Sequence, residues 1–111
     1  MTTVRLKFTI IQGFTPLPED AMMTRLGFRR DNRGLWERIM PAGPAAWHMS
    51  LHTEVRASDG AWGMILIDDD NGEPYEWVSQ IPPIRERFRQ DILSEAKRLR
   101  GHGLTGIRGM A

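Results

Sequence analysis

The sequence predicts an α+β fold, a two-layer sandwich in which an antiparallel-dominated, five-stranded sheet carries two helices on one face. Apolar and polar residues alternate along short segments separated by Gly, Pro, Asn and Asp, which is typical of strands. Two further segments have the apolar spacing of amphipathic helices, and such helices need an apolar surface to cover. The predicted order of elements is β-α-β-β-β-β-α.

The first predicted strand occupies residues 3–11, where apolar residues take every second position. A short helix is predicted at residues 19–26, because Pro18 stands before its first turn and acidic residues stand at its start. Gly27 is the expected residue beyond its C-terminus. A turn at residues 31–34 then leads into a strand at residues 35–40.

The middle of the chain predicts two hairpins. Residues 47–56 alternate strictly, and two-residue turns are expected at Asp59-Gly60 and Asn71-Gly72. The expected cross-strand pairs are Val55 with Met64 and Leu66 with Trp77.

This pairing also assigns the tryptophans to faces. It places Trp47, Trp62 and Trp77 on one side of the sheet, where we expect the helices to cover them. The pattern does not determine which face of the sheet Trp36 occupies. The tryptophans are therefore predicted to form the core rather than a surface for stacking bases.

The last helix is predicted at residues 84–100, with an apolar stripe at i, i+4 spacing, and Gly101 ends it. Residues 1–101 are expected to form a single domain. Residues 102–111 contain too many glycines for regular structure and are expected to form a flexible C-terminal tail.

Composition narrows the function classes. The 111 residues contain no cysteine, which removes disulfides, thiolate metal sites and a cysteine nucleophile. No secretory leader and no stretch of about eighteen apolar residues is evident, so a cytoplasmic location without membrane contact is expected. Arginine outnumbers lysine thirteen to two, yet the net charge is only +1, which is a weak signal for a general nucleic-acid binder.

The sheet face opposite the tryptophans holds the candidate functional residues. A polar row lies beside isoleucines there, and an exposed face of this kind favours contact with a protein partner or a second copy. Coverage by the C-terminal tail of the same chain is the alternative. The binding candidates on it are His48, Ser50, His52, Glu54, Arg56, Ile65 and Ile67.

Three of these residues also form the alternative catalytic set. On a strand, His52, Glu54 and Arg56 would share a face at intervals of about 6.6 Å. A general acid, a general base and a phosphate-binding cation suffice for metal-free RNA cleavage. The alternative hypothesis is therefore a metal-independent ribonuclease or phosphodiesterase.

No metal or cofactor is predicted. His48 and His52 have H-x-x-x-H spacing, but on a strand they lie about 13 Å apart, too far to share one ion. The acidic segment at residues 68–73 misses the calcium-loop pattern, because Ile67 takes the position of the first ligand.

The last helix supplies a further binding candidate. Arg85 and Arg89 are like charges at i, i+4 and cost stability unless an anion meets them. That anion is either the acidic segment 68–76 or a phosphate. A phosphate gives the weaker alternative of nucleic-acid binding, led by Arg85, Arg89 and the Arg29-Arg30-Arg33 turn. Arg87, Asp91 and Glu95 have the spacing of ordinary pairs on a helix surface.

Taken together, these features favour a non-catalytic binding protein over an enzyme. A protein partner or self-association is expected, and small cysteine-free chains of this kind are common among phage and mobile-element accessory proteins.

Overall fold

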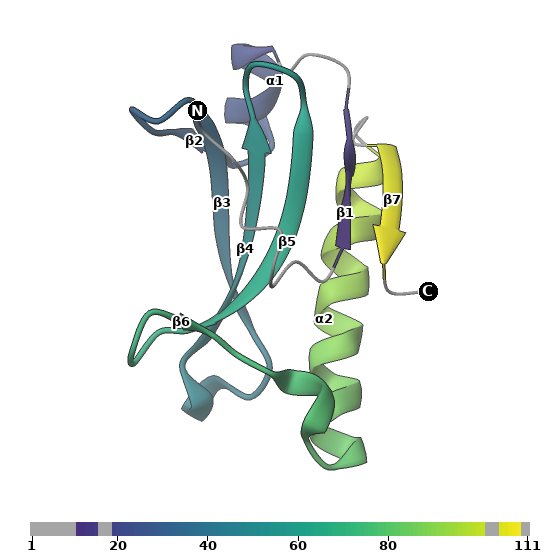
Figure 1. The fold of residues 1–111 in the computed structure, drawn as a ribbon. Coiled ribbons are helices and arrows are strands. Elements are labelled where there is room, and N and C mark those ends of the chain that lie inside the picture. The colour runs from purple at the N-terminus through teal and green to yellow at the C-terminus, as the bar shows by residue number, and fades with distance from the viewer. Residues whose placement is uncertain (1–10, 16–18, 102–104, 110–111) are drawn as a thin grey trace.

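The computed structural model describes residues 11–15, 19–101 and 105–109, and Figure 1 shows their arrangement. The elements in chain order are β1 (Ile11–Phe14), α1 (Asp20–Arg25), β2 (Arg29–Arg30), β3 (Leu35–Ala42), the 3-10 helix η2 (Ala45–Trp47), β4 (Met49–Arg56), β5 (Ala61–Asp68), β6 (Glu73–Pro74), the 3-10 helix η3 (Trp77–Ser79), α2 (Pro82–Gly101) and β7 (Thr105–Gly109).

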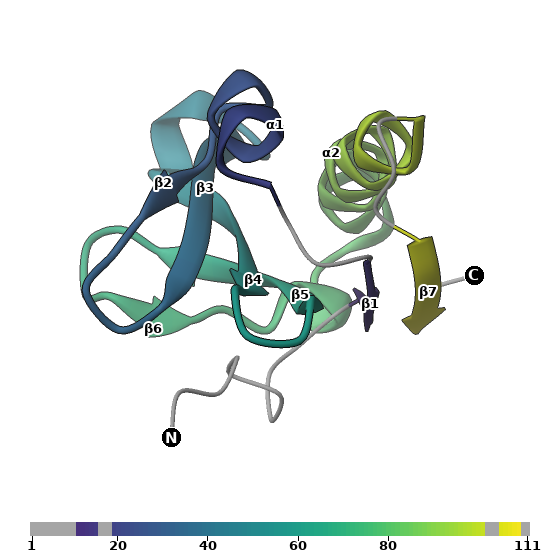
Figure 2. The same cartoon turned by 90° about the horizontal axis from the view of Figure 1, so that it is seen from above.

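The predicted α+β architecture is confirmed. The strands form one sheet in the order β2-β3-β4-β5-β1-β7, with β6 beside β5, and every recorded pair is antiparallel. Among the described strands, five have four or more residues, and β2 and β6 have two each. Figure 2 shows α1 and α2 on the same side of this sheet.

The core lies between the helices and the tryptophan face. Trp36 pairs with Val55 across β3 and β4, which places it on this inner face and fixes the side that the sequence left open. Trp62 and Trp77 are buried in the same cluster, and the partly buried Trp47 packs against it. The predicted role of the tryptophans as core residues is therefore confirmed.

The two predicted hairpin registers are wrong by two residues each. Val55 pairs with Trp62 rather than Met64, because residues 57–60 form a four-residue loop instead of a two-residue turn. In that loop, the Gly60 N–H donates to the Arg56 carbonyl at 2.8 Å, and Gly60 has a positive φ of 77°. A shift of two residues keeps every side chain on its face, so the face assignment survives.

The second hairpin is shorter than predicted. Ile67 pairs with Pro74, and β6 ends there, so Trp77 has no strand partner and lies in η3 instead. Trp47 likewise lies in η2 and not at the start of a strand. Its ring meets Phe88 and Tyr75 edge-on, at centroid distances of 6.0 and 6.5 Å.

Both helices are confirmed. Beyond α1, Gly27 has a positive φ of 94°, and the N–H groups of Gly27 and Phe28 bond the carbonyls of Thr24 and Met23. This is the Schellman arrangement that glycine permits at a helix end. The apolar stripe of α2 faces the core through Phe88, Ile92, Ala96 and Leu99.

The first and last strands of the described chain differ from the prediction. The strand expected at residues 3–11 lies outside the described residues except for Ile11, and β1 continues to Phe14. Thr105–Gly109, which the sequence assigned to a flexible tail, form β7 and pair with β1.

Candidate functional site

The face predicted to be open is largely closed. Ile65 and Ile67 are 1% and 4% exposed, and Glu54 is 2% exposed. β5 is an interior strand of the sheet, between β4 and β1. The prediction of an exposed isoleucine row is therefore wrong, and Ile65 and Ile67 offer no surface to a partner.

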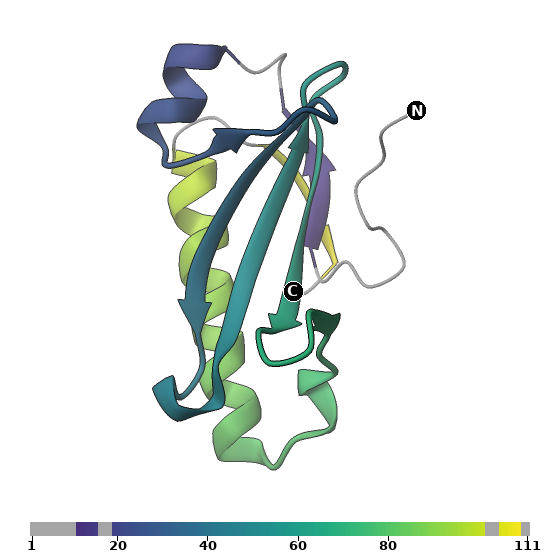
Figure 3. The ribbon, with the colours of Figure 1, turned by 90° about the vertical axis from the view of Figure 1, so that its left-hand side faces the viewer.

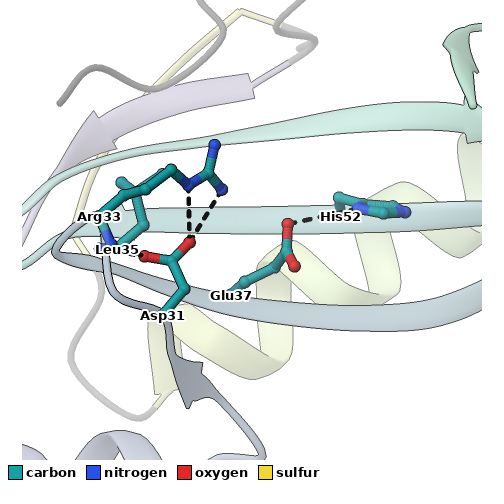
Figure 4. A network of polar contacts seen from close by, with 5 residues as sticks. All are labelled: Asp31, Arg33, Leu35, Glu37 and His52. Carbon is teal, nitrogen blue, oxygen red and sulfur yellow. Dashed lines mark hydrogen bonds and ion pairs between the residues drawn. The ribbon is translucent and has the colours of Figure 1, made fainter.

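His52 has the most unusual surroundings on this face. Its Nδ1 lies 3.5 Å from the Glu37 carboxylate, and neither ring nitrogen has a hydrogen-bond partner within the described chain. Glu37 stands directly opposite Glu54 in the β3–β4 ladder. Figure 4 shows the Glu37 carboxylate pointing towards the His52 ring.

The turn beside this cluster is held by Asp31 and Arg33, also seen in Figure 4. The Arg33 guanidinium donates to Asp31 Oδ2 at 2.8 Å, and the backbone N–H of Leu35 donates to Oδ1 at 3.1 Å. Burial raises the pKa of Asp31, but these hydrogen bonds outweigh it, and the pKa lies below the ordinary value. Asp31 therefore stays ionised and fixes the turn.

Arg56 is engaged by Asp59. Its Nε donates to Asp59 Oδ1 at 2.8 Å, and this hydrogen bond lowers the pKa of Asp59 to about 2. The three residues of the alternative catalytic set thus have separate environments. Glu54 is buried, Arg56 binds its own turn, and His52 faces Glu37.

The other two candidates of this row, His48 and Ser50, belong to a cleft at the end of the sheet. Its volume is about 820 Å³, within the range of small-ligand pockets. The cleft is bounded by the β3–β4 connection, the β5–β6 turn and the first half of α2. Its polar lining residues are His48, Ser50, Asp69, Asp70, Arg87 and Asp91.

Two aspartates of the β5–β6 turn hold one wall. Ser50 Oγ donates to Asp69 Oδ2 at 2.5 Å, and His48 Nδ1 lies 3.3 Å from Asp70 Oδ1. The Asp69 N–H donates to the His48 carbonyl at 2.9 Å. His48 is the one described non-glycine residue with a positive φ, 53°, a conformation that costs free energy in an ordinary side-chain residue.

The other wall comes from α2. Asp91 accepts a hydrogen bond of 2.7 Å from the Gly43 N–H, and Arg87 Nε lies 3.4 Å from the same carboxylate oxygen. Gly43 has a positive φ of 71°, and a Cβ there would collide with the Phe88 ring. The pairing of Arg87 with Asp91 agrees with the sequence prediction, whereas their position in a cleft was not predicted.

The arginines predicted on α2 remain at its surface. Arg85 is exposed, and Arg89 lies 3.6 Å from Glu86 on its own helix. No group of three or more potential metal ligands is found in the described part of the chain. Among the same residues, no helix is long and apolar enough to span a membrane.

Sequence reasoning missed the cleft because its two walls are distant in sequence. The available signal was the run of acids at residues 68–76, which we interpreted as a turn and as a candidate partner for Arg85 and Arg89 rather than as the wall of a cleft. The close approach of Asp91 to Gly43 depends on the packing of α2 under the sheet, which the local pattern does not contain.

The fold and the cleft describe a small α+β protein with a polar hollow at one end of its sheet. The structure is similar to the crystal structure of a DUF1831 family protein, Lp2179, from Lactobacillus plantarum. The TM-score is 0.69 at 10% identity, over 87% of this chain and 86% of the other. No protein-family model and no curated protein sequence matches the chain. At this identity the similarity establishes the fold alone.

Proposed function

We propose that this chain is a non-catalytic binding protein that contacts a protein partner at the cleft beside the β5–β6 turn. The observation that carries the proposal is the composition of that cleft. Its lining contains three carboxylates and one guanidinium. The apolar part of the lining includes Pro41, Ala42 and Met49. Charge of this sign favours a basic segment of the partner.

The geometry of the turn supports binding rather than catalysis. Asp69 and Asp70 are exposed, and each uses one carboxylate oxygen within the protein. Hydrogen bonds from the backbone of residues 70–72 to Asp68 fix the turn that presents them. A rigid turn loses little conformational entropy when a partner binds.

The test uses a lysine-rich peptide as the probe, with a glutamate-rich peptide of equal length beside it. We expect the lysine peptide to bind, and the double variant Asp69→Asn, Asp70→Asn to weaken binding about tenfold or more at low salt. Glu19→Gln removes an exposed carboxylate at the start of α1 and serves as the matched control. Equal binding by the double variant and the wild type would refute the cleft assignment.

The partner itself is found by a pull-down from the native host in which bound protein and nucleic acid are both identified. Loss of one captured protein with the cleft variant, and its retention with Glu19→Gln, supports the proposal. The proposed partner includes a second copy of this chain, and light scattering tests that self-association. A cytoplasmic location and a phage or mobile-element origin stay predictions.

One observation favours a second function, metal-free phosphodiester cleavage. Among the described residues, neither ring nitrogen of His52 has a hydrogen-bond partner, and Nδ1 lies 3.5 Å from the Glu37 carboxylate, as in a proton-transfer pair. Both nitrogens are buried, so this function requires that the outer face open to the substrate. Glu37 takes the place that the sequence gave to the buried Glu54. RNA cleavage in the presence of a chelator, abolished by His52→Ala, would support this function. Absence of cleavage by the wild type would end it.

Nucleic-acid binding through the exposed Arg85 is the weaker alternative. It predicts retardation of RNA or DNA at low salt and release as the salt concentration rises. Arg85→Gln would reduce that retardation, and an unchanged gel shift would exclude this residue from the contact.

A further inference from the structure

The β3 side of the sheet is an incompletely covered edge. β2 is the one strand recorded beyond β3 in the described chain, and it pairs only with Trp36 and Glu37. Figures 1 and 3 show β2 beside one end of β3 and β4 along its other side, with no drawn strand next to the rest of β3 on the β2 side. Residues 38–42 of β3 therefore have a strand partner on the β4 side only.

The direction of the backbone groups along this edge follows from the hairpin. The Leu35 N–H and carbonyl both bond to Asp31, on the β2 side of β3. In an antiparallel ladder these groups alternate sides, so those of Glu37 and Ile39 point the same way. Glu37 faces Arg29 of β2, whereas the N–H and carbonyl of Ile39 face the uncovered edge.

A hollow of about 310 Å³ lies beside this edge, and its lining includes Ile39, Glu37 and Arg29. The Ile39 side chain is 55% exposed, which is unusual for a large apolar residue in the middle of a strand. The other lining residues are Gly27, Arg30 and Asp31.

Three of the four charged residues in this hollow have partners. Arg30 lies 3.9 Å from Asp20 and stacks over Trp36, Asp31 binds Arg33, and Glu37 faces His52. Arg29 is exposed and has no partner among the described residues. Within the described part of the chain, the one charge in the hollow without a partner is therefore a cation.

We propose that this edge binds the extended C-terminal segment of a protein partner by strand addition. The added strand lies antiparallel to β3, in line with β2, and bonds the N–H and carbonyl of Ile39. A strand in that direction runs towards Arg29, so its terminal carboxylate meets the Arg29 guanidinium. An apolar side chain of the segment packs against Ile39.

Pro41 limits the length of the contact. It offers a carbonyl but no N–H, so the pairing is confined to a few residues around Ile39. The anchoring carboxylate consequently contributes much of the affinity. The hollow beside Ile39 and Arg29 shares no lining residue with the cleft, whereas Pro41, at the far end of the edge, also lines the cleft.

The experiment uses a library of hexapeptides with free C-terminal carboxylates and the same library with C-terminal amides. The readout is amide hydrogen exchange and chemical shift of the ¹⁵N-labelled protein. We expect the carboxylate library to slow exchange of the Ile39 N–H about tenfold or more. The amide library binds about tenfold more weakly, because it lacks the charge that meets Arg29.

Two arginine variants complete the test. Arg29→Gln is expected to reduce carboxylate binding to the level of the amides, and Arg25→Gln, an exposed arginine at the end of α1, leaves it unchanged. Circular dichroism confirms that both variants fold. An unchanged Ile39 N–H, equal binding of carboxylates and amides, or shifts confined to the cleft around His48 would each overturn the proposal.

Discussion

Glu95 connects three elements of the fold, and its removal should destabilise the protein measurably. Its side chain is 1% exposed, and it binds Arg38 of β3 at 3.0 Å and Arg98 of α2 at 2.6 Å. Arg98 in turn donates to the Leu26 carbonyl at the end of α1. The sequence suggested an ordinary surface pair for Glu95, and the structure corrects this, since the carboxylate is buried between two guanidinium groups.

The expected loss in the free energy of unfolding depends on the two guanidinium groups that Glu95→Ala leaves without their carboxylate. Removing one partner of a fully buried ion pair typically costs about 3 to 5 kcal/mol. Here the side chains of Arg38 and Arg98 remain 26% and 36% exposed, so water partly solvates the charges left behind. We therefore expect a loss of about 2 to 3 kcal/mol in the free energy of unfolding. Glu95→Gln keeps the shape and one acceptor, and should cost about half as much.

Urea denaturation followed by tryptophan fluorescence measures this change, since the buried tryptophans report on the core. The matched control is Glu86→Ala, which removes an exposed carboxylate 3.6 Å from Arg89 on the same helix and should change stability by less than about 0.5 kcal/mol. Thermal unfolding should shift by roughly 10 °C for Glu95→Ala in a chain of this length. If Glu95→Ala unfolds within about 0.5 kcal/mol of the wild type, the buried network does not stabilise the fold as argued.

Three further predictions concern the outer face and its turns. The hydrogen bond from Arg56 lowers the pKa of Asp59 to about 2 from 3.8, so its stabilising contribution is complete above pH 4 and lost as the pH falls to about 2. Urea midpoints of Asp59→Asn and wild type should therefore converge over that interval, and a constant difference would contradict the shift. A Cβ at Gly60 would collide with a neighbouring backbone carbonyl, whereas Gly72 has a similar φ and open space. Gly60→Ala should cost at least about 1 kcal/mol more than Gly72→Ala, and equal urea midpoints would be inconsistent with that collision. His52→Leu removes two buried nitrogens without hydrogen-bond partners, so stability near neutral pH should stay equal or rise by about 1 kcal/mol, and a clear loss in calorimetry would argue for a hydrogen bond at the ring.

The parts of the fold that sequence reasoning captured depend on periodicity alone. Alternation and helical spacing assigned the inner face of β4 and β5 and the stripe of α2, because a side chain's face depends only on whether its position is odd or even, or on its angle around the helix. That assignment survived the register error in both hairpins, since each error was an even number of residues. Trp62 was therefore assigned to the core correctly, although the predicted turn at Asp59-Gly60 was wrong.

Turn geometry and burial were harder to predict because both depend on tertiary contacts. The loop at residues 57–60 takes four residues because the Asp59 carboxylate bonds Arg56 and the Ala61 N–H, which a simple turn pattern does not include. The strand β7 at residues 105–109 was missed because its glycines lower strand propensity, whereas pairing with β1 supplies its backbone hydrogen bonds.

The closed outer face changes where binding should be sought on this molecule. Alternation identified the outward side of β4 and β5, but it carries no information on whether that side is covered, and Glu54 of β4 and Ile65 of β5 are buried there. We therefore place the proposed partner contacts where the sheet ends, since polar groups and backbone positions remain accessible there. Among the described residues, the cleft containing His48 and the uncovered edge at Ile39 are places of this kind. Because they differ in charge, a basic probe and a carboxylate probe should perturb different residues, which separates the two sites in a single labelled sample.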